Sequence, residues 1–598
     1  MHTLTTINAP LLGMVISVQT SAGEIVTAGD VLLVLEVMKV QSSVIAPCAG
    51  KITEVFVEPG ALVEQGSALM ELNSADTSLT PKISIDEPNQ KLDGEVNTSA
   101  AALAKFRTRS DNTLDAVRTS AADKRHANGY QTARENLEQL CDEGSFIEYG
   151  QFAVAAQRTT KDYKDLQISA AADGILTGIA QINSDLFGAD TSRTTVIVND
   201  YSVMAGTQGY FHHKKLDRIL AVAAQQNLPI IMLTEGGGGR PNDTDALTVN
   251  SGLQCDSFAS WASLAGQVPR ISIANGYNFA GNAALFGAAD ITIATKTSWI
   301  GMAGPAMIAG GGLGDFAPTD IGSVDIQRHN GVIDIVADDE AQAISVAKKC
   351  LAMFQGATDH WNCTEQGAIS QHLPDNRRFA YQVRDVINTL TDTDSFIELK
   401  AKFGGAVVTG FARFSGKPVG IMANDCNVLG GAIDVDAGEK AADFLNLCNQ
   451  FCLPVVSLCD TPGFMVGPDH EQRGAVRRLA KLFTAGAQIR TPLIAIVLRK
   501  CYGLGAQAMV GGSTSRPQYI ASWPSGEFGP MGLEGAVQLG NKKQLEAESD
   551  PVKRKILFTE LVAKAYARGQ AAEVASVMEI DAVIDPATTR DVIIASLY

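Results

Sequence analysis

The stretch "LPIIMLTEGGGG", residues 228–239, is a run of large apolar residues that ends in four consecutive glycines. It has a counterpart 225 residues later in "LPVVSLCDTPGF", residues 453–464. At the same offset "NDYSVMAG", residues 199–206, corresponds to "NDCNVLGG", residues 424–431. Continuous apolar runs bounded by glycine turns are typical of parallel strands that are covered on both faces. The sequence therefore predicts two copies of one α/β unit.

Single residues follow this 225-residue register as well. The matched pairs are Lys215 and Lys440, Glu235 and Asp460, and Tyr277 and Tyr502. Helical segments separate the apolar runs, which indicates βαβ units and mostly parallel sheets. The similar segments "LCDEGSFIE" (140–148) and "LTDTDSFIE" (390–398) precede the two copies. We expect one half over residues 101–385 and the other over residues 386–598.

A second, shorter repeat lies at the start of the sequence. Residues 9–35 match residues 46–72 at an offset of 37, with identical Ala-Pro pairs and glycines at turn positions. Short alternating strands with regularly spaced glycines predict a small all-β sandwich over residues 1–73. Between the copies, "LEVMKVQSS" (35–43) places Lys39 in a tight connection, where we expect its side chain to be exposed.

Composition narrows the possible functions. The 598 residues are 45% hydrophobic and carry a net charge of −17, which argues against nucleic acid or an anionic membrane as a partner. The ten cysteines show no paired metal-ligand spacing, so we expect no metal site and free thiols in a reducing cytoplasm. No leader or membrane-length apolar run is recognisable. Residues 74–100 are rich in Ser, Thr, Asp, Pro and Asn and are expected to be a flexible linker.

Glycine-rich and alanine-rich stretches recur in both α/β copies. They are "GYNFAGNAAL" (276–285) and "CYGLGAQAM" (501–509). Small residues at the start of a helix allow a carbonyl group to approach the main chain closely, and the amides there can donate hydrogen bonds to a developing oxyanion. The duplication makes an oxyanion-binding role the favoured interpretation over simple helix–sheet packing.

The N-terminal repeat resembles the biotinyl/lipoyl carrier domain, in which the lysine at the hairpin tip is acylated by the cofactor. Met38 directly before Lys39 favours biotin over lipoate. The commonest form in that family is Ala-Met-Lys-Met, so Val37 and Val40 are departures that preserve shape. The resemblance implies biotin covalently attached to Lys39.

Residues from about 125 to 598 resemble the carboxyltransferase component of acyl-CoA carboxylases. The resemblance rests on "GILTG" (174–178), "EGGGGRP" (235–241), "DTPGFMVG" (460–467), "RGAVRRLAKL" (473–482), "RKCYGLGAQAM" (499–509) and "WPSGEFGPMGLEGAV" (523–537). It implies two tandem crotonase-like (ββα-spiral) halves. No metal or nucleophilic side chain is needed for this chemistry, and His212–His213 are expected to lie solvated at the start of a helix.

The family pattern assigns residues to roles. It implies that the amides of Ala280 and Gly281 hold the acyl-CoA enolate and that Gly505 and Ala506 serve biotin. Because Leu504 is inserted relative to the family's Tyr-Gly-Gly-Ala, the second pair can also be Leu504–Gly505; the 225-residue offset favours Gly505–Ala506.

Two further groups are expected to contact the substrate. Gly237, Gly238 and Gly239 form a turn whose amides can face an anion, and Arg240 suits a phosphate of coenzyme A. Gln507 and Ala508 stand where many short-chain members have an acidic or branched residue. The length of the acyl chain is therefore left open.

The resemblance implies transfer of a carboxyl group from carboxybiotin on Lys39 to the α-carbon of an acyl-CoA. It also implies a separate biotin carboxylase chain, a biotin protein ligase and a homohexamer whose sites lie between the N-half of one subunit and the C-half of another. One alternative is a decarboxylase or transcarboxylase that runs the transfer in reverse. Another is a catalytically silent scaffold that binds acyl-CoA, which the retained glycine-rich stretches and Lys39 disfavour.

Overall fold

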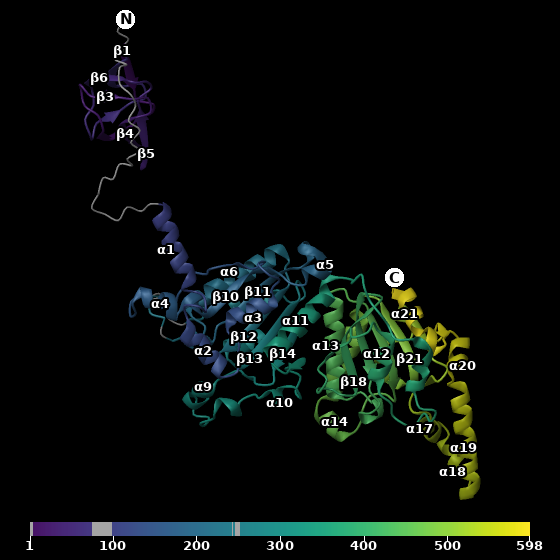
Figure 1. Cartoon of the computed structure of the whole chain (residues 1–598). Helices are drawn as coiled ribbons and strands as arrows, with labels where there is room; N and C mark the ends of the chain where they lie inside the picture. The colour runs from purple at the N-terminus through teal and green to yellow at the C-terminus, as the bar shows by residue number, and fades with distance from the viewer. Residues whose placement is uncertain (1–3, 75–98, 242, 246–251, 598) are drawn as a thin grey trace. The chain divides into compact units, whose positions relative to one another are not determined.

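The computed structural model describes residues 4–241, 243–245 and 252–597, apart from residues 75–98. The chain divides into two compact units, Met1–Thr98 and Ser99–Tyr598 (Figure 1). The expected linker, residues 74–100, lies mostly outside the described residues.

The first unit is a sandwich of two four-stranded antiparallel sheets, as the 37-residue repeat predicted. The strands are β1 (Leu4–Asn8), β2 (Gly13–Val18), β3 (Ile25–Val26), β4 (Val31–Val37), β5 (Val40–Ile45), β6 (Gly50–Val55), β7 (Leu62–Val63) and β8 (Ala68–Asn73). One sheet has the order β1-β8-β6-β3 and the other β5-β4-β2-β7. Residues matched by the repeat, such as Leu32 with Leu69 and Leu35 with Leu72, are fully buried in a shared core.

The second unit contains two eight-stranded mixed sheets of the same design. The strands of the first are β9 (Ile147–Glu148), β10 (Ile175–Gln181), β11 (Arg193–Asn199), β12 (Ile230–Gly236), β13 (Arg270–Phe279), β14 (Ile291–Thr295), β15 (Trp299–Gly301) and β16 (Ile335–Ala337). Those of the second are β17 (Ile397–Leu399), β18 (Val407–Phe414), β19 (Lys417–Asn424), β20 (Val455–Thr461), β21 (Leu493–Tyr502), β22 (Tyr519–Ser522), β23 (Glu527–Gly529) and β24 (Ala582–Val583). Each sheet starts with an antiparallel hairpin and continues with parallel strands.

Amphipathic helices cover these sheets at equivalent positions. Helix α6 (Tyr210–Gln226) follows β11, and α13 (Val435–Gln450) follows β19. Helix α6 buries Leu216, Ile219 and Leu220, which lie three to four residues apart and therefore share one face. The side chain of Asp434 caps α13 by accepting a hydrogen bond from the Ala437 amide at 2.9 Å.

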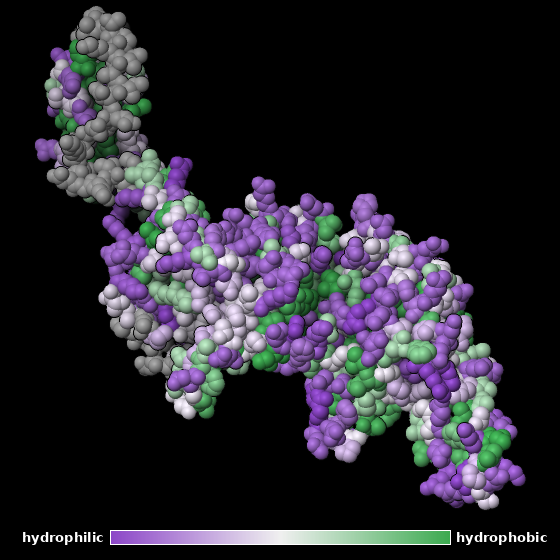
Figure 2. All heavy atoms as spheres, turned by 60° about the horizontal axis from the view of Figure 1, so that its bottom comes forward, coloured by the Kyte–Doolittle hydropathy of each residue, from purple (hydrophilic) through white to green (hydrophobic). Residues whose placement is uncertain are grey.

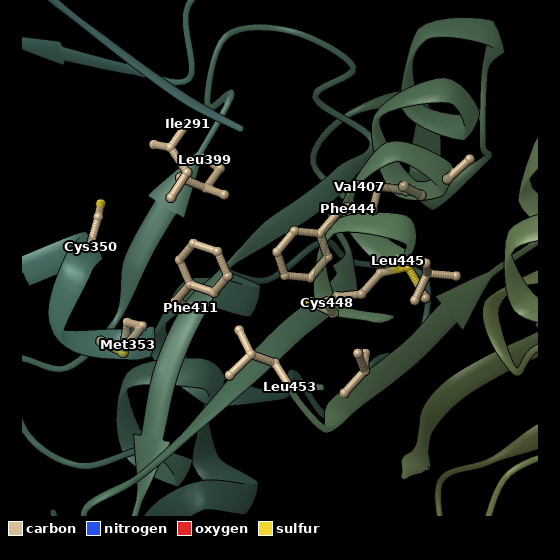
Figure 3. Close-up of a cluster of buried hydrophobic side chains, with 14 of the residues drawn as sticks. Ile291, Cys350, Met353, Leu399, Val407, Phe411, Phe444, Leu445, Cys448 and Leu453 are labelled. Carbon is tan, nitrogen blue, oxygen red and sulfur yellow. The ribbon is translucent and has the colours of Figure 1, made fainter. Parts of the chain in front are cut away.

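One hydrophobic core joins the two halves of the second unit. Helix α11 (Glu340–Gln355) contributes Cys350 to the same buried cluster as Phe411 of β18 and Phe444 of α13. Figure 3 shows Phe411 and Phe444 facing each other, with ring centroids 5.8 Å apart. This shared core makes the halves a single packed body.

The expected division between residues 385 and 386 falls inside α12 (Val383–Leu390), so the structure corrects it. The buried face of α12 packs with β18, β19 and Ile369 in the core of the C-half. A helix that contributes to one core belongs to that half as a whole. A boundary before Ile369 would keep this helix and its core in one half.

Candidate functional site

The hairpin tip between β4 and β5 consists of Met38 and Lys39. Val37 pairs with Val40, so the turn has two residues, and both have positive φ, at 47° and 67°. Such turns match the twist of antiparallel strands but usually contain Asn or Gly. Met38 is 95% exposed, and Lys39 is exposed beside it. The prediction of an exposed Lys39 is confirmed, and its amine is accessible for acylation by biotin.

In the N-half, the glycine-rich turn after β12 packs tightly against the neighbouring segment Met204–Gly206. Gly236 has φ 117°, and a Cβ there would lie 2.5 Å from the Gly206 Cα. The Gly237 amide donates to the Ala205 carbonyl at 3.3 Å. The turn is thus held by backbone contacts, and the Gly237 amide is not free to face an anion; for Gly238 and Gly239 that role stays a prediction.

The expectation that Arg240 meets a phosphate of coenzyme A is wrong. Its guanidinium is buried, lies 2.5 Å from the Asp173 carboxylate, and donates to the Thr207 carbonyl at 2.9 Å. Asp173 is fully buried, and burial raises its pKa, which the Arg240 charge opposes. Arg240 therefore neutralises a buried carboxylate that lies 67 residues away in the sequence, a contact that no local pattern reveals.

Helix α8 (Gly281–Gly287) begins directly after β13, at the predicted pair Ala280 and Gly281. Ala280 has φ 52°, and its amide donates to the Gly301 carbonyl at 3.0 Å, so this donor is already used. Gly281 is the first helical residue, and its amide has no intrahelical acceptor. A Cβ at Gly281 would overlap the side-chain oxygen of Gln208. Of the predicted pair, Gly281 is the residue that offers a free main-chain donor.

Asn282, which sequence reasoning missed, holds this region together. Its amide group donates to the carbonyls of Gly206 at 3.1 Å, Glu235 at 3.2 Å and Gly237 at 2.9 Å. Its side-chain oxygen accepts from Asn199 and Gln208. One buried side chain thus fixes the start of α8 against three other segments. The only local signal was an amide residue inside a run of Gly and Ala.

In the C-half, strand pairing corrects the register of the second oxyanion motif. Gly236 pairs with Asn278, whereas Thr461, its 225-offset counterpart, pairs with Cys501. The offset between β13 and β21 is therefore 223, because the connection after β20 is two residues shorter. Ala280 corresponds to Gly503, and Tyr277 to Lys500 rather than to Tyr502.

Helix α16 (Gly503–Met509) starts at Gly503, which has φ 60°, close to the 52° of Ala280. The first helical residues leave their amides without intrahelical acceptors, whereas the fourth, Ala506, is placed to donate within the helix. In the 223 register Gly281 corresponds to Leu504, so of the two alternatives the register favours Leu504–Gly505, the pair that contains Leu504. Gly505 is required because a Cβ there would lie 2.5 Å from the Gly463 carbonyl carbon. Gln507 is exposed on this helix.

A cavity of about 890 Å³ lies in the N-half at the carboxyl ends of the parallel strands. Its lining includes Ala205, Glu235, Gly276, Tyr277 and Trp299. Gly276, with φ 58°, corresponds to Arg499 in the C-half, and Trp299 corresponds to Glu527. The Arg499 side chain lies against Asp460, the counterpart of Glu235, at 2.8 Å, and a Cβ at Gly276 would lie 2.9 Å from the Glu235 carboxylate. The absence of a side chain at Gly276 therefore helps to open the cavity in the N-half.

Each half buries a carboxylate at the end of its second parallel strand. Arg125 binds Glu235 through both oxygens, at 2.6 and 2.9 Å, while Arg499 binds Asp460 at 2.8 Å. Burial raises the pKa of Glu235 to about 7, and the Arg125 charge opposes that rise. The arginines come from different elements, which explains why a repeat search finds only the acids.

The matched lysines are buried in both halves. Lys215 donates to the carbonyls of Ala172 at 3.0 Å and Ile175 at 2.5 Å, and Lys440 donates to Lys400 at 2.9 Å and Phe403 at 3.1 Å. Burial lowers the pKa of each to about 8. Each lysine thus binds its helix to the connection that leads into the first strand of the hairpin, β10 or β18.

The expectation that His212 and His213 are solvated is wrong. They lie at the start of α6 as expected, but His212 is fully buried and its amide donates to Asp173 at 2.7 Å. Burial lowers the pKa of both imidazoles.

In the described part of the chain, no group of three or more His, Cys, Asp or Glu residues is arranged to hold a metal, and no helix is long and apolar enough to cross a bilayer.

Comparison with known proteins identifies the family. Residues 124–598 match the carboxyl transferase domain, and residues 5–72 match the biotin-requiring enzyme domain. The methylmalonyl-CoA carboxyltransferase 12S subunit of Propionibacterium freudenreichii subsp. shermanii is 32% identical, over 79% of this chain and 89% of its own. The propionyl-CoA carboxylase beta chain of Saccharopolyspora erythraea is 30% identical, over 75% of this chain and 84% of its own.

Solved structures of similar proteins point to the same family. A single-chain, multi-domain long-chain acyl-CoA carboxylase is similar at a TM-score of 0.79 and 44% identity over 99% of this chain, which spans only 56% of that protein. The transcarboxylase 12S core, described as a hexamer, is similar at a TM-score of 0.74 and 30% identity, over 85% of this chain and 96% of its own. The chain therefore belongs to the carboxyltransferase family of biotin-dependent acyl-CoA carboxylases and carries a biotin domain of its own.

Proposed function

We propose that this protein moves a carboxyl group between biotin on Lys39 and the α-carbon of an acyl-CoA, with the acyl-CoA in the N-half. The observation that carries this proposal is a structural feature found in both halves: a residue with positive φ at the start of a helix, Ala280 in one half and Gly503 in the other. Two such devices suit a reaction in which two oxygens become negatively charged. Biotin, when attached, supplies the carrier for the carboxyl group.

The residues of the chain act by orientation and by donating hydrogen bonds. In the N-half, the Gly281 amide is the donor for the thioester oxygen as charge develops on it, and Asn282 keeps that amide in place. In the C-half, the donors are the amides of Leu504, the counterpart of Gly281, and of Gly505. Preorganised amides of this kind typically contribute about 3–4 kcal/mol each to transition-state stabilisation.

Assembly and partners follow the family expectation. We propose a cytoplasmic homohexamer served by a biotin protein ligase and a separate biotin carboxylase. In support of self-association, Leu539, Val552 and Ile556 are exposed on α17 (Leu533–Gly540) and α19 (Pro551–Arg568). Figure 2 shows apolar side chains among polar ones on this protruding lobe. Exposed apolar surface of this kind is typical of protein interfaces.

The reverse transfer is the second candidate function. Two relatives that match most of the chain favour it. One is the transcarboxylase subunit described above, and the other is the methylmalonyl-CoA decarboxylase subunit alpha of Veillonella parvula, which is 29% identical. The amides would stabilise the same enolate in either direction.

The decisive experiment supplies the biotinylated full chain and a biotin carboxylase with ATP, bicarbonate and a panel of acyl-CoAs from acetyl to long-chain. We expect one class of acyl-CoA to gain a carboxylate, with loss of the signal in Lys39→Ala. If no acyl-CoA is carboxylated but malonyl-type thioesters lose CO2, the reverse function is correct. The panel also determines the acyl chain length that the family relatives leave open.

A further inference from the structure

Three basic side chains line the cavity in the N-half, and two of them are already paired with carboxylates. Arg118 lies 2.8 Å from the Asp200 carboxylate and donates to the Ser202 hydroxyl at 2.7 Å. Arg125 is bound through both oxygens of Glu235. A buried guanidinium paired in this way contributes to folding and has little charge left for an anion.

Lys124 is the third cation, on helix α2 (Thr119–Ala127). Its side chain is exposed at the mouth of the cavity, and none of the described carboxylates forms an ion pair with it. In a protein with a net charge of −17, a lysine that lines a cavity and stays unpaired creates a local site for an anion.

The cavity walls indicate the kind of anion. Tyr130, Tyr201, Tyr277 and Trp299 line it, and the rings of Tyr277 and Trp299 lie 5.1 Å apart. A volume of about 890 Å³ suits a ligand larger than a simple ion. Aromatic walls with one free ammonium at the rim suit a planar base that carries phosphates.

We propose that this cavity binds the nucleotide end of the thioester substrate and that Lys124 is its phosphate partner, in the role that Arg240 cannot fill. The inference rests on the proposed function, since it assumes an acyl-CoA in the N-half. The thioester then extends inward from Lys124, past Glu235 and Ala205, toward the start of α8. Lys124 is a binding residue for the coenzyme and takes no part in carboxyl transfer.

The test measures binding of coenzyme A to the full biotinylated chain by calorimetry, for wild type, Lys124→Ala and Lys124→Arg. Lys349→Ala is the matched control, because Lys349 is an exposed lysine of the same half outside this cavity. We expect Lys124→Ala to weaken binding about tenfold, the usual effect of losing one charge-assisted hydrogen bond. Lys124→Arg and the control should bind within about twofold of wild type.

Repeating the titration with 3′-dephospho-coenzyme A locates the contact. A smaller loss in Lys124→Ala places the ammonium on the 3′-phosphate, whereas an equal loss places it on the pyrophosphate. Unchanged affinity in Lys124→Ala overturns the proposal, as does an equal loss in Lys124→Arg, which indicates a structural role. If wild type binds coenzyme A but transfers no carboxyl group, only the proposed function fails.

Discussion

At the scale of single residues, the chain places residues with strained backbone conformations, and glycines, where its main chain must be exposed. Met38, Lys39 and Ala280 are non-glycine residues with positive φ, which costs of order 1 kcal/mol or more each. Such strain persists only where the surroundings enforce it. Among the places where this protein has it are the hairpin tip that carries Lys39 and the helix start that presents the Gly281 amide.

Gly281→Ala tests the oxyanion role directly. The added methyl group would overlap Gln208 and approach Phe258, so the amide must shift. Displacing one preorganised donor is expected to lower kcat for carboxyl transfer roughly 100- to 1,000-fold. Gly287→Ala, at the other end of α8, is the control because a methyl group there meets no atom within 4 Å. Equal activity of the two variants would refute the assignment.

Asn282→Ala should cost both stability and activity. It leaves three buried carbonyls without their donor, and each such loss typically costs about 1–3 kcal/mol. Because neighbouring losses are not additive, we expect a decrease of about 3 kcal/mol in the free energy of unfolding, measured with denaturant. A decrease below about 0.5 kcal/mol, the range of ordinary surface substitutions, would show that Asn282 does not hold these segments.

At the scale of elements, the duplication was predictable and its register was not. The offset of 225 holds for β12 and β20, where continuous apolar runs make the alignment clear. It changes to 223 at β13 and β21, because loops and short helices tolerate a two-residue difference that leaves no hydrophobic pattern. The pairing of Arg240 with Asp173 was equally hidden, since contacts between distant segments are decided by packing rather than by local sequence.

The buried lysines make a prediction about pH at this scale. Between pH 8 and 10.5 the unfolded chain keeps a proton on Lys215 that the folded chain has lost, so this group makes the folded state more stable as pH rises. The free energy of unfolding of wild type, minus that of Lys215→Met, should rise by up to about 3 kcal/mol over that range. Lys440→Met should behave alike. A difference that stays flat with pH would mean that the lysines remain protonated when buried.

At the scale of the whole molecule, the protein combines a carrier and a catalyst in two compact units. The sandwich of residues 4–74 has its own core, and the two α/β halves share another. The cavity and the start of α8 lie in the N-half, whereas the start of α16 lies in the C-half. A carrier that is a unit of its own can serve the catalytic unit of another chain in an assembly.

Co-expression of Lys39→Ala with Gly281→Ala tests this exchange. The first variant has no carrier lysine but an intact N-half, and the second has a carrier but a displaced amide. If a biotin domain reaches the N-half of a neighbouring chain, mixed assemblies should regain a measurable fraction of wild-type carboxyl transfer. With random mixing, about half of the N-halves and about half of the carriers are intact, so this fraction is at most about one quarter. The two variants purified separately and then mixed without exchange of subunits are the control. Activity no higher than that of either variant alone would show that each carrier serves only the N-half of its own chain.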